Sequence, residues 1–149
     1  MTPDEIISLL PYSKPFLFVD SIIKIDENSV TGDYTFRKDE FFYKGHFKDH
    51  PVTPGVILTE IMAQIGVVCL GIFLLKDKIS SDSFPGIALV SSQVDFFLPV
   101  FPEEKVIVSS EKIYFRFGKL KCKVEMKNSG GEIVCKGIIS GMLKRKENE

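Results

Sequence analysis

Residues 54 to 75 read PGVILTEIMAQIGVVCLGIFLL, an apolar run with a single charged residue, Glu60. At 1.5 Å per residue, a run of about 22 residues forms a helix about 33 Å long. Thr53 and Pro54 are typical of an N-cap and the first helical position, so the helix is predicted to begin there. Because it is apolar on nearly every face, such a helix must be surrounded by the rest of the fold.

The remaining chain has the pattern of one short helix and six strands. The first residues, MTPDEIISLL, carry a capping box and a proline at the first helical position. A polar break is expected at 76–83 and a solvated end at 144–149. Runs rich in β-forming residues are separated by turn signals: residues 15–26, 30–37, 86–100, 105–117, 119–127 and 132–143. We therefore predict an α+β fold in which a curled antiparallel sheet wraps around one long central helix.

The composition fits a single domain over residues 1–149. A chain of 149 residues with 44% hydrophobic content encloses one core. Its 19 Lys and Arg against 20 Asp and Glu give a net charge of -1, so no nucleic-acid or membrane partner is expected. Three cysteines without CxxC spacing favour a reducing, cytoplasmic location. The central run is long enough to cross a bilayer, but Glu60 and Gln64 would then lie in hydrocarbon, so no membrane span is expected.

The start of the central helix is a candidate site for a carbonyl oxygen. With Thr53 as N-cap, Gly55 carries one of the unpaired N–H groups at the positive end of the helix dipole. Glycine lacks the Cβ that would hold a ligand away, so this N–H can stabilise a developing oxyanion. Taken alone, the Thr-Pro-Gly sequence is also typical of ordinary helix capping.

Glu60 is a candidate general acid. It lies on the second turn of the helix, and Gln64 lies one turn further on the same face. A carboxyl group in an apolar setting resists ionisation, which raises its pKa and makes it usable as an acid near neutral pH. The alternative is a glutamate on a solvated edge, but the apolar neighbours of Glu60 leave little edge.

His46 is the natural base to pair with this acid, since the usual pKa of a histidine suits proton transfer at physiological pH. A histidine in a loop can also be structural or solvated. The proline-rich loop between His46 and Glu60 permits the two to face each other, within one chain or across a subunit boundary. A metal site is not expected, because the sequence HFKDH lacks the helical HExxH arrangement.

Four ordered elements of this region resemble a known motif: Gly45-His46-Phe47, His50-Pro51-Val52, Pro54-Gly55-Val56, and Glu60 followed by Met62-Ala63-Gln64. They closely resemble the motif of the 3-hydroxyacyl-(acyl-carrier-protein) dehydratases of bacterial fatty acid synthesis, a hotdog-fold family. Residues 15–20, PFLFVD, also look like the first strand of that family. The likeness covers most of the chain and is sharpest at 11–20 and 45–64.

The resemblance implies a role for each residue. His46 would remove the α-proton of a 3-hydroxyacyl thioester, and Glu60 would help the 3-hydroxyl group leave as water. Gly55 would donate its N–H to the thioester carbonyl, and Gln64 would orient the acid. The other residues expected to line the substrate site are Val56, Phe96 and Phe97. Neither a metal nor a cofactor is implied.

The resemblance also implies an assembly and a partner. In the family, active sites form at a dimer interface, with histidine and acid from different protomers, and some members assemble three dimers. The substrate would be carried by acyl carrier protein, or by coenzyme A. This chain departs from the family at Lys48 and Asp49, where proline and glycine are usual. It also has the sequence Asp95-Phe96-Phe97-Leu98 where the family often carries an arginine thought to meet the acidic carrier.

The function expected from these residues is conversion of a (3R)-hydroxyacyl thioester to the trans-2-enoyl thioester and water, in fatty acid synthesis or a related lipid or polyene route. A hotdog thioesterase is one alternative, with Glu60 activating water against a carbonyl polarised by Gly55. A noncatalytic thioester-binding subunit is another, although binding alone needs neither a base nor an acid.

Overall fold

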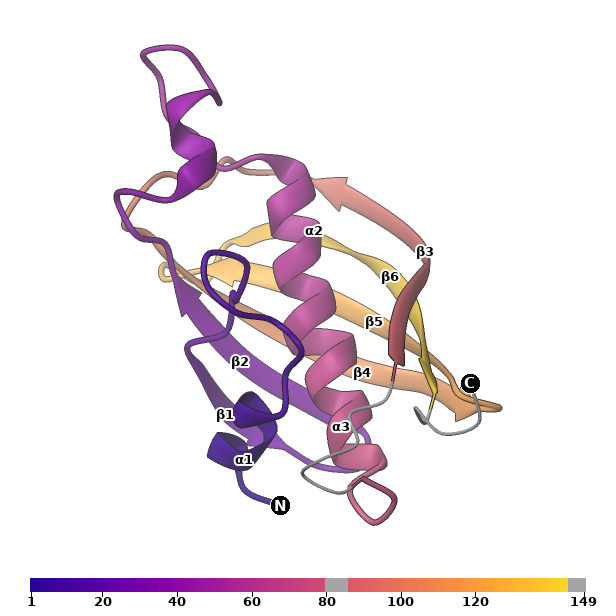
Figure 1. Ribbon diagram of the computed structural model, residues 1–149. Helices are drawn as coiled ribbons and strands as arrows, with labels where there is room; N and C mark the ends of the chain where they lie inside the picture. Colours follow the sequence, from indigo (N-terminus) through magenta and orange to yellow (C-terminus); the bar gives the residue numbers. More distant parts are fainter. Residues whose placement is uncertain (80–85, 145–149) are drawn as a thin grey trace.

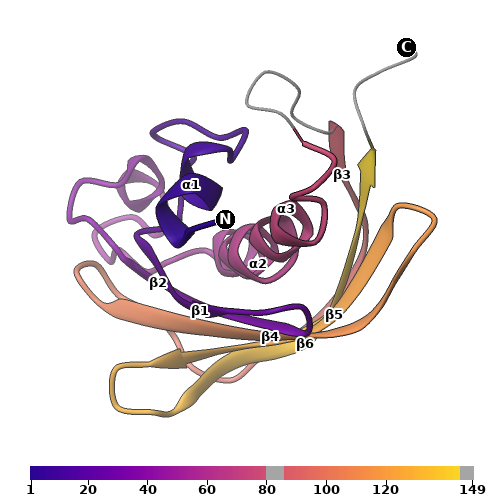
Figure 2. The ribbon, with the colours of Figure 1, turned by 90° about the horizontal axis from the view of Figure 1, so that it is seen from below.

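The computed structural model describes residues 1–79 and 86–144, where a six-stranded antiparallel sheet curls around one helical axis (Figures 1 and 2). The helical elements are α1 (Pro3–Ser8), the 3-10 helix η1 (Phe41–Lys44), α2 (Gly55–Ala63), the π-helical turn η2 (Gln64–Cys69) and α3 (Leu70–Leu74). The strands are β1 (Ser21–Ile25), β2 (Ser29–Thr35), β3 (Gly86–Phe96), β4 (Lys105–Arg116), β5 (Lys119–Asn128) and β6 (Ile133–Lys144). The predicted polar break lies partly, and the predicted solvated end almost wholly, outside the described residues.

The sheet has the strand order β1-β2-β4-β5-β6-β3, and every neighbouring pair is antiparallel. β4 and β5 are joined by a tight turn, because Arg116 pairs with Lys119 and leaves two residues between them. These residues, Phe117 and Gly118, have φ values of 52° and 77°. Two positive φ angles match the twist of a two-residue hairpin, although such positions usually hold glycine or asparagine.

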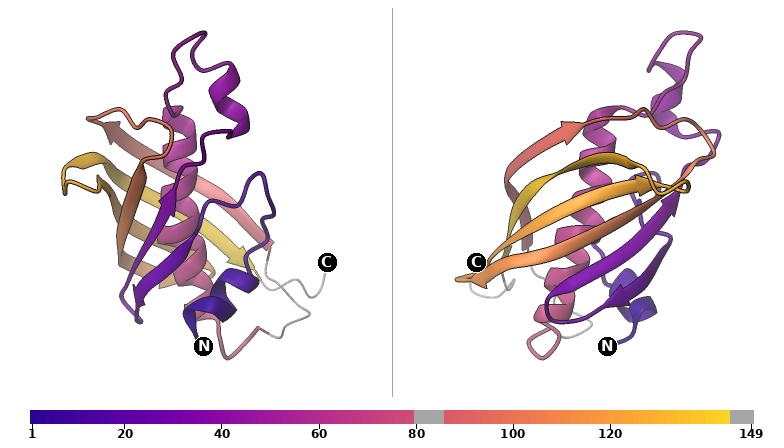
Figure 3. Two further views of the ribbon diagram at one scale, coloured as in Figure 1. Left: turned by 90° about the vertical axis from the view of Figure 1, so that its left-hand side faces the viewer. Right: turned by 180° about the vertical axis from the view of Figure 1, so that it is seen from behind.

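The helical elements α2, η2 and α3 form one continuous rod on the concave side of the sheet (Figures 2 and 3). Gly66 lies where the rod touches the strands, since a Cβ there would come within 3.0 Å of Val124 and 3.1 Å of Ser110. The hydroxyl of Ser110 donates a hydrogen bond of 2.8 Å to the Gly66 carbonyl. Residues 55–74 are long and apolar enough to cross a membrane, and an 18-residue stretch of them has a mean hydropathy of 2.2. However, 72% of that stretch is buried within the fold. The rod is the core helix that the sequence predicted.

The structure corrects the predicted helix start. Pro54, with an extended backbone, is the N-cap, and Gly55 is the first helical residue. Thr53 does not cap the helix, because its hydroxyl is bound to the Tyr43 hydroxyl at 2.7 Å. The Gly55 N–H is still one of the first N–H groups of the helix, which have no partner within it.

The structure also shortens the predicted first strand, residues 15–26, to Ser21–Ile25. The preceding residues form a strap across the helix, because the side chain of Gln64 binds their backbone. Its carbonyl oxygen accepts from the Phe18 N–H at 2.9 Å, and its amide nitrogen donates to the Phe16 carbonyl at 3.0 Å. The β-forming composition of the segment thus serves burial against the helix, where Phe18 is fully buried.

Candidate active site

His46 lies in a loop that projects beyond the start of α2, at the top of Figure 1. Its Nδ1 is 2.9 Å from the Val52 carbonyl oxygen, and the Val52 N–H donates to the His46 carbonyl at 2.9 Å. A carbonyl oxygen can only accept, so Nδ1 carries the hydrogen in this contact and Nε2 keeps its lone pair. The loop therefore holds the imidazole in the tautomer that a general base needs.

A buried pair of hydroxyl groups closes the base of this loop. Tyr43, just before His46, and Thr53, just after Val52, are 6% and 5% exposed and lie 2.7 Å apart through their oxygens. The Thr53 N–H also donates to the Val100 carbonyl at 2.8 Å. Burial raises the pKa of Tyr43 to about 12, so its hydroxyl stays protonated. The pair fixes both ends of the loop that carries the imidazole.

Replacing Thr53 by valine is expected to lower stability and turnover together. Valine keeps the shape of the side chain but leaves the Tyr43 hydroxyl buried without its partner, which costs about 1–3 kcal/mol of unfolding free energy. The loosened loop should lower kcat and leave KM nearly unchanged. Denaturant unfolding and steady-state kinetics measure both effects. Thr53→Ser, which keeps the hydroxyl, is the matched control, and wild-type stability and kcat in Thr53→Val would show that the pair does not hold the loop.

Glu60 and Gln64 form a connected pair on one face of the rod. The Gln64 amide nitrogen donates to Glu60 Oε2 at 3.0 Å, in addition to its bond to the strap. Gln64 is fully buried and every polar group of its side chain is engaged, so it has a single orientation. Burial raises the pKa of Glu60, and the hydrogen bond from Gln64 opposes this shift more weakly. The arrangement suits a carboxyl group that holds a proton until it is needed.

The raised pKa of Glu60 predicts how Glu60→Gln changes stability with pH. A carboxyl group that binds its proton more tightly in the folded state stabilises the fold below its unfolded pKa and loses that contribution as the pH rises through the folded pKa. Glutamine cannot ionise, so the variant should melt above the wild type at about pH 8, and the difference should shrink toward about pH 4. Thermal melts across this range measure the difference, and a constant or reversed difference would contradict the prediction.

A hollow of about 600 Å³ brings most of the predicted site residues together. The start of the rod contributes Gly55, Val56 and Glu60, and the edge strand β3 contributes Phe96. The other lining residues are Thr59, Ala63, Leu89, Ser92 and Val94. A Cβ on Gly55 would lie 3.3 Å from the Phe96 ring, so glycine leaves space in a crowded part of the wall. A thioester carbonyl bound here would meet the helix N-terminus and the acid in one cavity.

Three predicted residues lie outside this lining. Gln64 is behind the wall, where it holds Glu60. Phe97 is 53% exposed, and its ring lies 5.7 Å from the Lys136 ammonium group. His46 stands in the projecting loop and does not contribute to the hollow in the described part of this chain. The other five lining residues were not predicted. Side-chain alternation along a strand could have placed Ser92 and Val94 on the same face as Phe96, but a register shift just after Leu89 breaks that pattern.

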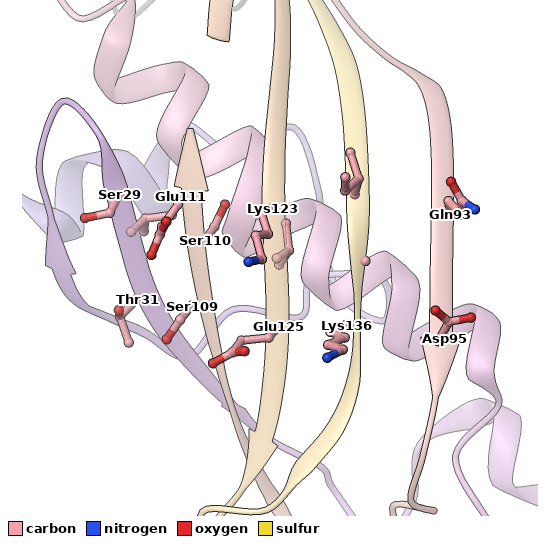
Figure 4. Close-up of a pocket in the computed structure, with 14 residues that line it drawn as sticks. Ser29, Thr31, Gln93, Asp95, Ser109, Ser110, Glu111, Lys123, Glu125 and Lys136 are labelled. Atoms are coloured by element: carbon pink, nitrogen blue, oxygen red, sulfur yellow. The ribbon is translucent and has the colours of Figure 1, made fainter. Parts of the chain in front are cut away.

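A second hollow, about 530 Å³, lies on the other face of the sheet and holds none of the predicted site residues. Figure 4 shows polar side chains from five strands standing over it, with the helix behind. Opposite charges face each other across the strands, as in the pairs Glu111 with Lys123 and Glu125 with Lys136. Such cross-strand pairs are typical of a solvated sheet face.

Comparison with known proteins places the chain among enzymes. Residues 10–136 match the family described as the FabA-like domain. A 3-hydroxyacyl-(acyl-carrier-protein) dehydratase FabZ of Caldicellulosiruptor bescii is 36% identical over 146 residues, which cover 95% of this chain and 97% of that protein. The protein of the same description from Chlamydia muridarum is 34% identical over 148 residues, covering 97% and 93%.

Solved structures agree on the architecture. The dehydratase heterocomplex ApeI:P from Xenorhabdus doucetiae matches with a TM-score of 0.80 at 17% identity, covering 98% of this chain and 93% of that one. A hypothetical thioesterase with coenzyme A from Streptococcus pneumoniae matches with a TM-score of 0.60 at 12% identity, covering 85% and 87%. These identities show the fold alone, and the predicted hotdog fold is confirmed. With its family match and its relatives, the chain belongs to the FabA-like family of 3-hydroxyacyl-(acyl-carrier-protein) dehydratases that its motif resembles.

Proposed function

We propose that the protein removes water from a (3R)-hydroxyacyl group carried by acyl carrier protein, giving the trans-2-enoyl thioester, in cytoplasmic fatty acid or related lipid or polyene synthesis. The observation that carries this proposal is Glu60, a carboxyl group of raised pKa that shares one cavity with the Gly55 N–H. Dehydration needs an acid beside the leaving hydroxyl and a donor at the thioester carbonyl, and the cavity holds both.

The elimination uses three groups of the protein. His46 Nε2 takes the proton from C2 of the acyl chain, and the charge that develops on the thioester oxygen is stabilised by the Gly55 N–H. The electron pair of the broken C–H bond forms the C2–C3 double bond as the C3–O bond breaks. Glu60 gives its proton to the departing hydroxyl, which leaves as water. The enzyme is then an imidazolium and a carboxylate, and transfer of one proton from His46 to Glu60 restores it.

The acid and the base come together when two copies of the chain pair, which is part of the proposal. β3 is 11 residues long and pairs with β6 on one side, while its other side has no neighbour among the described strands. Leu89, Val90 and Phe96 on this strand are 58%, 47% and 49% exposed. An exposed apolar edge of this length favours antiparallel pairing with a second copy. Because β3 also forms one wall of the hollow, the partner would complete it and supply its His46.

A spectroscopic assay tests the proposed reaction. The purified wild type, given 3-hydroxyacyl and 2-enoyl thioesters on acyl carrier protein, should interconvert them, followed by the absorbance of the enoyl thioester. A thiol-trapping reagent should detect no release of free thiol, because dehydration leaves the thioester intact. Thiol release would instead support the thioesterase alternative. Absence of both signals with several acyl lengths would favour a noncatalytic binding subunit.

A further inference from the structure

The turn between β4 and β5 exposes an aromatic side chain in a strained backbone position. Phe117 is 96% exposed and has a φ of 52°, in the left-handed region that favours glycine. Ile113, on the strand that leads to it, is 48% exposed. The fold leaves Phe117 almost wholly uncovered and about half of Ile113. A residue that is costly for the fold and unburied by it is expected where contact with another molecule offsets the cost.

Three cations surround this turn. The Arg116 guanidinium lies 4.2 Å from the centroid of the Tyr114 ring, and the Lys119 and Lys121 ammonium groups lie at 5.9 Å and 5.8 Å. Lys119, through a hydrogen bond and its charge, lowers the pKa of this tyrosine. None of the ion pairs between described residues includes these three cations. The hairpin tip, residues 113–121, therefore presents exposed apolar side chains with three cations around them.

The hairpin is basic, although the chain as a whole is slightly acidic. Residues 112–123 hold five of the 19 Lys and Arg and no Asp or Glu, so the rest of the chain has 14 basic residues against 20 acidic ones. Asp95 lines the hollow on the other face of the sheet, and the hollow that holds Gly55 and Glu60 has no cation among its described lining residues. An acidic partner would thus be attracted to the hairpin tip, while the rest of the surface, with its excess of acidic residues, would not attract it.

We propose that the hairpin tip is the docking surface for the acidic acyl carrier protein that presents the substrate. Phe117 would enter an apolar cleft of the carrier, and Arg116, Lys119 and Lys121 would meet its carboxylates. This inference rests on the proposed function, because it names the partner of the same site.

The proposed pairing of two copies through β3 would bring the tip near the partner's site. The β4–β5 turn lies at the end of the sheet opposite the His46 loop, and Gly86, the start of β3, lies at the same end as the turn (Figure 1). Antiparallel pairing of β3 with a second copy sets the partner's strand end beside Gly86. Between β5 and the partner's β3 there would be three strand spacings, about 14 Å. A carrier on the tip of one protomer would therefore serve the cavity of the other.

Phe117→Asn gives the first test. Asparagine tolerates a left-handed backbone, so the variant should melt at or above the wild-type temperature. Loss of the aromatic contact should nevertheless lower kcat/KM for a carrier-linked 3-hydroxyacyl substrate about tenfold. The same acyl group on N-acetylcysteamine, which has no protein to dock, should be turned over within about twofold of wild type. Equal losses on both substrates would overturn the proposal, and so would an unchanged rate with the carrier.

Charge reversal gives the second test. Arg116→Glu combined with Lys119→Glu should also lower kcat/KM about tenfold for the carrier-linked substrate, and the wild-type rate should fall with added salt. The control is Lys24→Glu, a single charge reversal of an exposed lysine on β1, the edge strand opposite β3. This variant should keep kcat/KM for the carrier-linked substrate close to the wild-type value. A loss in the control as large as in the double variant would overturn the local role of the tip.

Direct binding separates this proposal from the proposed function. Fluorescence anisotropy of labelled holo acyl carrier protein should show binding to the wild type and at least about tenfold weaker binding to Phe117→Asn. If the wild type bound the carrier through the tip yet dehydrated neither substrate, the docking surface would be supported and the proposed reaction would be wrong. Wild type that does not bind the carrier would overturn the surface, as would a change of oligomeric mass in Phe117→Asn, which would make the tip a contact between copies of the chain.

Discussion

His46→Ala is expected to lower kcat for dehydration by about 10²- to 10⁴-fold, the range that loss of a general base produces. The imidazole is held through Nδ1 by the Val52 carbonyl, so Nε2 is the nitrogen offered to the substrate. Alanine removes that lone pair and leaves the hollow intact, because His46 contributes nothing to its wall in the described chain. The absorbance assay on the carrier-linked substrate measures the loss.

The same loop provides a matched control. His50 is exposed, and its contacts with Phe47 run through backbone atoms alone, so His50→Ala should keep near-wild-type turnover. The thermal melt of His50→Ala should stay close to the wild type because its ring is exposed, and that of His46→Ala should fall slightly, because its half-buried ring makes one hydrogen bond to Val52. If His46→Ala retained near-wild-type kcat, or if His50→Ala lost as much, the assignment of the base would be wrong.

Mixing two inactive variants is expected to restore activity if each site takes its base and its acid from different protomers. Glu60→Gln removes the transferable proton and His46→Ala removes the base, so each variant alone should be nearly inactive. Unfolding and refolding them together gives roughly half mixed dimers by random pairing, and each mixed dimer holds one intact site of two. The mixture should therefore recover roughly a quarter of the wild-type rate.

The control is each variant refolded separately and mixed without denaturant, which should stay inactive if subunits do not exchange. No recovery in a mixture that mass spectrometry shows to contain mixed dimers would mean that His46 and Glu60 act within one chain. That outcome would require the projecting loop to fold back over its own hollow.

Most of the helices and strands could be predicted from local sequence patterns. The central run could be read as a helix because its length and uniform apolarity leave no other structure, and five of the six strands fall close to their predicted bounds. The strand predicted at 15–26 is wrong in its first half, because one buried side chain, Gln64, binds the Phe16 and Phe18 backbone. Such a long-range contact leaves no periodic signal. The π-helical turn from Gln64 to Cys69 was not predicted either, because its residues are of the same types as those of an ordinary buried α-helix.

The sequence indicated candidate residues for the site but little of their arrangement. Gly55 was predicted from the start of the helix and Glu60 from its single charge in an apolar run, and only the structure shows that both line one cavity, because positions five apart do not share a helix face. The position of His46 depends on the conformation of its loop, which no spacing in the sequence reveals. The Tyr43–Thr53 pair was hidden because threonine before proline is also a common cap, and only the fold shows that its hydroxyl points elsewhere.

The three hydrogen bonds of the Gln64 side chain make the Phe18 amide a natural spectroscopic reporter. That amide donates to the same carboxamide whose nitrogen donates to Glu60 Oε2, so only the Gln64 side chain lies between it and the acid. Ionisation of the acid polarises the carboxamide between them and alters the shielding of the Phe18 nitrogen and proton. A single backbone resonance, that of the Phe18 amide, thus reports the charge of the acid.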